Sequence, residues 1–141
     1  MATEPKQTAP RPVPRPTALT QPFWDAARKG KFLLQFDRAT GKPQFWPRPV
    51  SIHSGRTDME WREASGKGRL YAWTEVHVPL RGFEDVAPYV LAAVELDEGV
   101  RVMARLVNVA AGALSPGMRV RVAWEQLSDE ISLYVFEPDG A

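Results

Sequence analysis

The sequence predicts a mainly β fold, with a short N-terminal helix, a small ribbon-like module and a five-stranded barrel. Two observations favour this class. Five runs between residues 68 and 136 are rich in β-branched and aromatic residues and mostly alternate in polarity, which is typical of strands. Before them, residues 35–55 hold two polar turns that each end in glycine, which is the outline of a ribbon of short strands. At 141 residues, 44% of them hydrophobic, the chain is long enough for one domain or for two small ones that share a core.

Residues 1–20, MATEPKQTAPRPVPRPTALT, predict an arm outside the folded part. They hold five of the 13 prolines and no aromatic residue. Such a segment buries little surface, and its prolines favour an extended polyproline geometry. We interpret residues 1–20 as a Pro-rich N-terminal arm, and two alternatives stay open: a disordered leader, or an extended strap that lies on a partner subunit.

The folded part begins with a helix and three short strands, which together make the ribbon-like module of residues 21–63. In PFWDAARKG, Pro22 suits the first turn of a short amphipathic helix, and Gly30 suits its end. The predicted strands flank the two polar turns, over residues 31–36, 43–46 and 59–62.

Residues 64–141 predict a barrel of the OB type. Its five strands are expected over residues 68–78, 89–96, 100–107, 118–126 and 131–136. Asp97-Glu-Gly99 predicts a tight hairpin turn, and Ser128-Asp129 predicts another. A longer connection over 110–117 separates the third strand from the fourth. Five strands with one long interruption fit a small Greek-key barrel of this type better than a sandwich, which needs about seven.

The two polar turns have the spacing of a zinc site without its usual ligands. Asp37 and Thr40, and then Ser51 and Ser54, stand three positions apart just before a glycine, which is the spacing of C-x-x-C-G. The chain has no cysteine, and Ser and Thr hydroxyls are poor zinc ligands. We therefore expect no metal at these four positions and no cofactor. Hydrophobic packing is expected to hold the turns together instead, through Trp24, Phe32, Leu34, Phe36, Phe45, Trp46 and Trp61.

The sequence offers no catalytic constellation. Its only histidines are His53 and His77, and neither lies in a recognisable nucleophile motif. The paired carboxylates fall in predicted turns, where acids are ordinarily solvated. We therefore expect no turnover by this chain alone.

Charge and hydropathy argue against two classes of partner. The formal charge of +1 is too close to balance to predict nucleic-acid binding. A single-stranded nucleic-acid-binding OB-fold protein stays an alternative because residues suited to it share strand faces, in the pairs Arg101 and Arg105, Arg119 and Arg121, and Tyr71 and Trp73. No run approaches the roughly 18 apolar residues that span a bilayer, and the N-terminus lacks a secretory leader. We expect a cytoplasmic protein without a membrane partner.

The order of these parts is similar to that of a known family. A PFW helix and the FWPRP strand lie around two C-x-x-C-G-like turns, and SGKGRLYAWTEVH, PYVLAAVELDEG and SPGMRVRV follow. Over residues 21–138 the chain resembles the OB-fold, acyl-CoA-associated proteins with an N-terminal rubredoxin-like zinc ribbon, formerly a domain of unknown function. In this comparison Asp37, Thr40, Ser51 and Ser54 stand where the family has its four zinc cysteines. The resemblance thus predicts a degenerate, metal-free ribbon.

The resemblance implies a non-catalytic accessory subunit of a thiolase-like acyl-CoA enzyme, such as a thiolase, a retro-aldolase or an acyltransferase of lipid, steroid or aromatic acid metabolism. The subunit would stabilise a thiolase-fold catalytic partner in a hetero-oligomer and help shape its channel for acyl-CoA, a shared ligand. CoA phosphates favour Arg and Lys, and the candidates are Arg48, Arg56, Lys67 and Arg69. Exposed aromatic residues often anchor interfaces, and the candidates are Trp46, Phe83 and Tyr89. A self-contained acyl-CoA enzyme is the remaining alternative.

Overall fold

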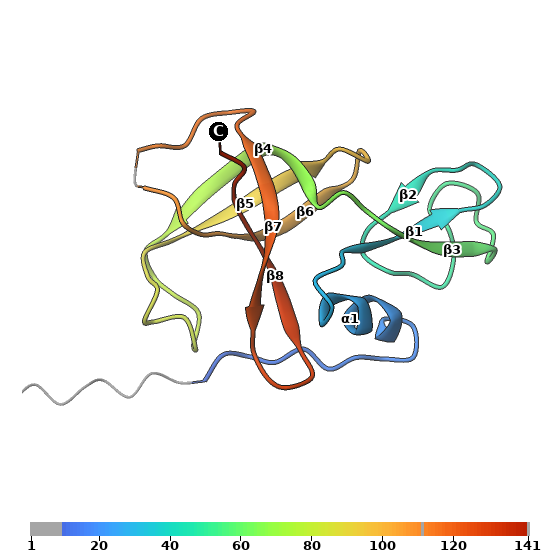
Figure 1. Cartoon of the computed structure of the whole chain (residues 1–141), viewed down its shortest axis with the longest axis horizontal. Helices are drawn as coiled ribbons and strands as arrows, with labels where there is room; N and C mark the ends of the chain where they lie inside the picture. Colours follow the sequence, from blue (N-terminus) through green and yellow to red (C-terminus); the bar gives the residue numbers. More distant parts are fainter. Residues whose placement is uncertain (1–9, 111, 141) are drawn as a thin grey trace, which may run out of the picture.

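The computed structural model describes residues 10–110 and 112–140, and it confirms the predicted mainly β class (Figure 1). One short helix, α1 (Gln21–Ala27), precedes all the strands. The strands are β1 (Leu33–Asp37), β2 (Pro43–Gln44), β3 (Met59–Glu63), β4 (Lys67–Val76), β5 (Tyr89–Leu96), β6 (Arg101–Leu106), β7 (Arg119–Gln126) and β8 (Ser132–Pro138). Their ends lie within two residues of those predicted, because each strand carries its own local pattern.

The strands from β4 to β8 close into a barrel. Their order around it is β4-β5-β6-β8-β7, and β7 pairs with β4 again where Val120 lies opposite Gly68. Neighbours are antiparallel except β6 and β8, which are parallel where Leu106 lies opposite Phe136. Thus β8, the last strand in sequence, lies between β6 and β7, which is the Greek-key order predicted for the OB type.

Both predicted hairpin turns are present. Between β5 and β6, Gly99 N donates to Leu96 O over 2.8 Å, and between β7 and β8, Leu127 N donates to Ile131 O over 2.9 Å. Gly99 has a φ of 96°, a conformation that glycine adopts freely because it has no Cβ.

One prediction about β4 is wrong, because the strand contains a β-bulge. Strict alternation would put Tyr71 and Trp73 on one face. The register shifts just after Leu70, so Trp73 lies opposite the buried Ala92. Tyr71 instead packs against the exposed Arg101, whose guanidinium carbon lies 3.8 Å from the ring centroid. A bulge adds one residue to a strand and thereby reverses the side-chain alternation beyond it.

The strands β1, β2 and β3 form a second sheet in the order β2-β1-β3, which lies beside the barrel with α1 below it (Figure 1). Two buried glutamines hold the long β2–β3 connection against this sheet. Gln35 Oε1 accepts a hydrogen bond from Arg48 N, and Gln44 Oε1 accepts one from Ile52 N, both at 2.8 Å. Gln44 Nε2 also donates to Gln35 Oε1 over 2.9 Å, which joins the two side chains.

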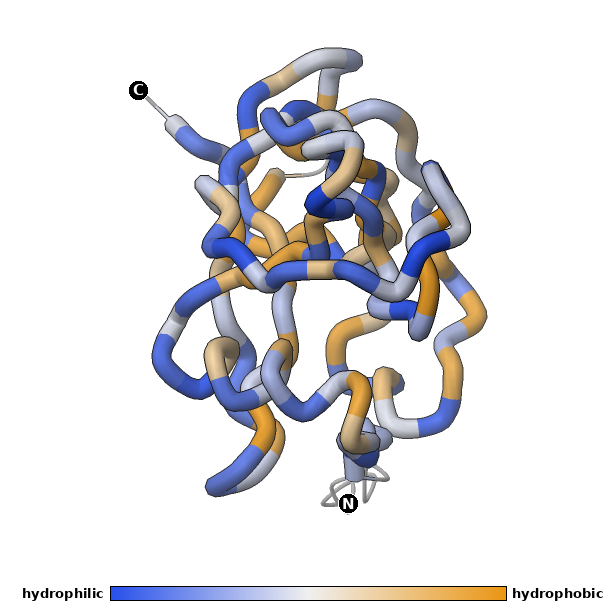
Figure 2. The backbone as a smooth tube through the Cα atoms, turned by 90° about the vertical axis from the view of Figure 1, so that its right-hand side faces the viewer, coloured by the Kyte–Doolittle hydropathy of each residue, from blue (hydrophilic) through white to orange (hydrophobic). Residues whose placement is uncertain are grey.

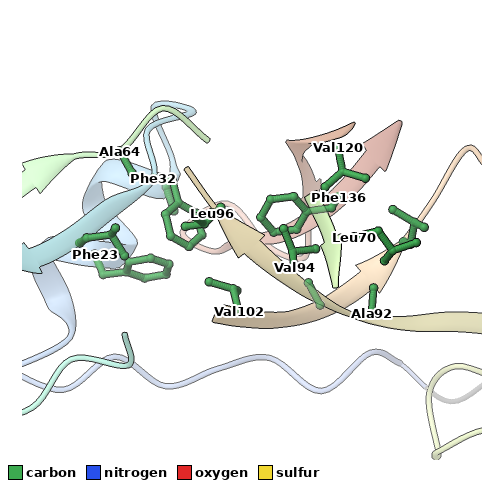
Figure 3. Close-up of a cluster of buried hydrophobic side chains, with 14 of the residues drawn as sticks. Phe23, Phe32, Ala64, Leu70, Ala92, Val94, Leu96, Val102, Val120 and Phe136 are labelled. Atoms are coloured by element: carbon green, nitrogen blue, oxygen red, sulfur yellow. The ribbon is translucent and has the colours of Figure 1, made fainter. Parts of the chain in front are cut away.

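The ribbon-like sheet and the barrel share one hydrophobic core. Figure 3 shows its side chains in a continuous row from Phe23 and Phe32 to Phe136 and Leu70. Phe23 of α1 lies at the joint, with its ring centroid 5.4 Å from that of Phe32 and 5.8 Å from that of Tyr134 on β8. Figure 2 shows short hydrophobic and hydrophilic stretches following one another along the chain, as expected for strands with one buried face.

Residues 10–20 of the predicted arm lie along the chain's own barrel. In Figure 1 this segment crosses the end of the β7–β8 hairpin before it enters α1. Arg11 fixes it there, because its guanidinium donates to Asp85 Oδ1 over 2.6 Å and to Glu125 Oε1 over 3.1 Å. Residues 1–9, on which the rest of the arm prediction falls, lie outside the described residues.

Candidate functional site

An apolar hollow of about 200 Å³ lies on the outer face of the barrel, against the loop that joins β4 to β5. Its walls come from that loop and from β5, β6 and β8, and they include Leu80, Phe83, Tyr89, Leu91, Met103 and Leu133. Leu80 is 71% exposed and Met103 is 60% exposed. Sites for complete small-molecule ligands enclose roughly 300–1,000 Å³. The hollow therefore has room for one or two side chains of another protein rather than for a complete acyl-CoA.

Strand alternation and the β4–β5 loop together create this surface. On β5, Ala92 is fully buried in the barrel, so its neighbour Leu91 points outward, beside Arg105 of β6. The loop folds back onto the barrel, and the Phe83 ring centroid lies 5.7 Å from that of Tyr89. Two of the three predicted interface residues, Phe83 and Tyr89, thus lie together in the wall of the hollow, each partly buried.

The third predicted interface residue, Trp46, lies elsewhere. Its ring centroid is 5.2 Å from that of Phe23 and 5.9 Å from that of Trp24, so it belongs to the aromatic joint beside α1. Trp46 is still 36% exposed, although it is not among the residues that line the hollow.

Charged side chains border the hollow on one side. Glu125 of β7 accepts hydrogen bonds from both Arg11 and Arg105, and Arg11 also pairs with Asp85. The hydrogen bond from Arg11 holds the pKa of Asp85 below its usual range, and the same bond raises the pKa of Arg11. Arg105 Nε is buried and has no hydrogen-bond partner among the described residues. A buried donor without a partner is energetically unfavourable.

The four cations predicted to meet CoA phosphates lie on two different parts of the chain. Arg48 and Arg56 are exposed on the connection between β2 and β3. Lys67 and Arg69 lie on β4, where each faces a carboxylate of this chain, at 3.8 Å for Lys67 and 2.6 Å for Arg69. Arg48 and Arg56 are therefore better placed to meet an anionic ligand.

Two arginines of β7 also have acidic partners. Arg119 forms a bidentate pair with Asp97 at 2.8 and 2.9 Å, and Arg121 donates to Glu137 over 3.1 Å. The hydrogen bonds from Arg119 hold the pKa of Asp97 below its usual range. Because each of these positive charges has a carboxylate partner, this part of β7 does not form the positively charged groove that binds the backbone of a single-stranded nucleic acid.

The two histidines have ordinary partners. His53 Nε2 lies 2.8 Å from the carbonyl oxygen of Pro43, and the exposed His77 lies 3.6 Å from Glu75. Neither contact is the nucleophile–base pair of a hydrolytic site. In residues 10–110 and 112–140, no group of three or more His, Cys, Asp or Glu side chains is arranged to hold a metal ion. The described helix is also too short to cross a membrane.

The two polar turns meet at a buried carboxylate. Asp37 is fully buried at the end of β1, and its Oδ2 accepts hydrogen bonds from Ser51 Oγ at 2.6 Å and from Ser54 Oγ at 2.5 Å. Its Oδ1 accepts from Ala39 N at 2.7 Å and from Thr40 N at 3.3 Å. These donors, the Ser51 hydroxyl above all, hold the pKa of Asp37 well below its usual range.

The expectation that hydrophobic packing holds the turns together therefore accounts for only part of the arrangement. Phe32 and Leu34 are buried as expected, but the direct links between the turns are hydrogen bonds to Asp37. Sequence reasoning also missed Gln35 and Gln44, because an isolated glutamine on a short strand is normally solvated. The available signal was spacing: Gln35 and Asp37 are two positions apart, so a strand places both on one face.

Comparison with known proteins identifies relatives over most of the chain. Residues 61–125 match the family described as the ChsH2 C-terminal OB-fold domain. The chain is 36% identical over 138 residues to a probable enoyl-CoA hydratase alpha subunit of Thermomonospora curvata, covering 96% of this chain and 41% of that protein. It is 32% identical over 118 residues to a DUF35 domain-containing scaffold protein of Pyrococcus furiosus, covering 84% of this chain and 82% of that protein.

Solved structures show the same relationship. A chain of the Ltp2–ChsH2(DUF35) aldolase has a TM-score of 0.80 and 31% identity, covering 89% of this chain and 98% of that one. A DUF35-family protein of unknown function from Sulfolobus solfataricus shares the fold, with a TM-score of 0.61 at 13% identity. The OB-fold part of the predicted relationship is thereby confirmed, and this chain belongs to the DUF35 family, with a barrel that matches the OB-fold domain of ChsH2.

Proposed function

We propose that this chain is a non-catalytic accessory subunit of a thiolase-like acyl-CoA enzyme, which it stabilises and whose acyl-CoA channel it helps to shape in the cytoplasm. The main support is its likeness to a chain of the Ltp2–ChsH2(DUF35) aldolase over 98% of that chain, because that name joins a DUF35 component to Ltp2. Relatives named as hydratase alpha subunits and as scaffold proteins point the same way.

The apolar hollow is the proposed docking point for the catalytic subunit. Leu80 and Met103 expose large apolar side chains beside Phe83 and Tyr89, and association energy concentrates in a few such anchors. An apolar side chain of the partner would fill the hollow, whose walls are mainly apolar.

Acyl-CoA is the proposed shared ligand. Arg48 and Arg56 would bind its phosphates, since both are exposed and Arg favours bidentate contacts with phosphate. Lys67 and Arg69 belong to the same proposal, but each would have to exchange a carboxylate of this chain for a phosphate. The remaining contribution is by shape, because a protein wall that excludes water protects the thioester.

Co-expression with a candidate thiolase-fold catalytic subunit tests the proposal. The two chains should purify as one complex. Leu80→Glu and Met103→Glu should each weaken that complex roughly tenfold or more, because a charge would then be buried in an apolar contact. Ile52→Glu is the matched control: Ile52 is 57% exposed on the ribbon-like module, so its variant should bind with unchanged affinity in calorimetry.

Three results would contradict the proposal. The two hollow variants could bind as tightly as Ile52→Glu, which would move the docking point elsewhere. The purified chain could turn over acyl-CoA alone, which would make it a self-contained enzyme. It could also bind single-stranded DNA with an affinity that falls steeply with salt, which is the signature of a nucleic-acid-binding protein.

A further inference from the structure

We infer that the two polar turns form a metal-independent clamp, in which the carboxylate of Asp37 makes the bonds that a structural ion makes in a zinc ribbon. The zinc-ribbon proteins that the chain resembles hold an ion at these positions, but the side chains of this chain do not fit one. A structural zinc site takes four strong donors such as thiolate, imidazole or carboxylate. At these positions Asp37 is the one such donor, and Thr40, Ser51 and Ser54 supply neutral hydroxyls.

The Asp37 carboxylate is already fully engaged. Two hydroxyls donate to Oδ2, from Ser51 at 2.6 Å and from Ser54 at 2.5 Å. Two amides of its own turn donate to Oδ1, at 2.7 and 3.3 Å. An ion bound here would displace these donors from a fully buried carboxylate and would gain only weak ligands in exchange.

The two turns repeat one another bond for bond. Gly41 N donates to Asp37 O over 2.7 Å, and Gly55 N donates to Ser51 O over 2.9 Å. In each turn the first side chain also accepts hydrogen bonds from the backbone amides two and three positions further on. These distances are 2.7 and 3.3 Å for Asp37, and 3.0 and 3.3 Å for Ser51. The hydrogen bond from Ser51 to Asp37 therefore links equivalent points of two equivalent turns.

Among the described residues, hydrogen bonds rather than an ion pair compensate the buried charge of Asp37. The neighbouring Arg38 pairs with Asp58 at 3.0 Å instead. A buried carboxylate is costly unless it is hydrogen-bonded or paired, and here four donors meet that requirement. Removing the charge should therefore loosen both turns, including the turn that does not contain Asp37.

Metal analysis of the purified full-length chain, produced in zinc-supplemented medium, tests metal independence. We expect no stoichiometric zinc by mass spectrometry and the same melting temperature with and without a chelator. One zinc ion per chain, or a melting temperature that falls on chelation, would overturn the inference. Neither result depends on the proposed function.

Asp37→Asn tests the clamp itself, with Asp58→Asn as the matched control because Asp58 is an exposed carboxylate of the same module. Asn keeps the shape but has one acceptor oxygen in place of two. Hydrogen exchange at the His53 and Ser54 amides, which bond to Ser51, should speed up about tenfold in Asp37→Asn. The control should leave it unchanged, and unchanged exchange in Asp37→Asn itself would overturn the inference.

Ser54→Ala provides a milder variant. It removes one of the two hydroxyl donors and leaves the carboxylate in place. Exchange at the Ala39 and Thr40 amides in the opposite turn should rise several-fold, although Ser54 makes no direct bond to them. No change at these two amides would show that the turns are independent and would also overturn the inference.

Discussion

Tyr134 shows how a single side chain at the joint responds to its surroundings. Its ring centroid lies 5.5 Å from that of Phe32 and 5.8 Å from that of Phe23, both in edge-to-face geometry. Burial in this apolar environment raises the pKa of its hydroxyl to about 12, because a phenolate would lose its hydration there. Asp37 shows the opposite response, since its four donors stabilise the charged form.

Because the pKa of the Tyr134 hydroxyl is raised, we expect the free energy of unfolding to fall in alkali. Its pKa is about 10 in the unfolded chain and about 12 in the folded one. Its contribution to stability is therefore fully present below pH 10 and is lost as the pH rises through 12. The free energy of unfolding should fall by up to about 2–3 kcal/mol across this range. In urea denaturation, Tyr134→Phe should remove this part of the fall, whereas the exposed Tyr71→Phe should keep it; equal profiles would contradict the argument.

Within the barrel, β4 and β5 approach each other unusually closely at one position. A Cβ placed on Gly68 would lie 2.4 Å from the carbonyl oxygen of Glu95 and 3.0 Å from Leu96 Cα. Both obstacles are backbone atoms of β5, so they cannot move aside as a flexible side chain does. The same two strands carry the bulge that places Trp73, which is 37% exposed, opposite Ala92, so the pairing of β4 and β5 sets which side chains share a face.

Gly68→Ala should therefore destabilise the barrel by about 1–3 kcal/mol, as expected for overpacking against a fixed backbone. Gly140→Ala is the matched control, because a Cβ there meets no atom within 4 Å. Its free energy of unfolding should stay within about 0.5 kcal/mol of the parent chain. Chemical denaturation measures both, and equal stability of the two variants would show that the strands separate without cost.

At the scale of the whole molecule, an aromatic cluster joins the ribbon-like sheet, α1 and the barrel into one folding unit. Phe23 is fully buried, and its ring packs against aromatic rings from each part, including Trp24, Phe32, Phe45, Trp46 and Tyr134. The arm adds a polar link, since Arg11 ties residues 10–20 to β7 and to the loop beside the hollow. The proposed docking surface is thus held by groups far apart in sequence.

Phe23→Ala should lower the stability of the whole chain by about 3–5 kcal/mol, because it leaves a cavity where the parts meet. The transition should remain single when followed by tryptophan fluorescence and by far-UV circular dichroism. Ile52→Ala, at a site that is 57% exposed, should change stability by less than about 0.5 kcal/mol. Two separate transitions in the parent chain would contradict a shared core.

The sequence by itself determined the class of the fold, the positions of its strands and its membership of the DUF35 family. Those features depend on local alternation and on the order of short motifs, both of which are written along the chain. It also predicted Phe83 and Tyr89 as interface candidates, but not that they lie together.

Only the tertiary structure decided the position of the bulge in β4 and the set of residues that completes the hollow. It also decided that residues 10–20 lie on the chain's own barrel and that Asp37 links the two turns. Each of these depends on contacts between residues distant in sequence. Asp37 lies 14 residues before Ser51, and Arg11 lies 114 residues before Glu125. A periodic pattern contains no information about such pairs, because it reports which face a side chain takes and not what it meets there.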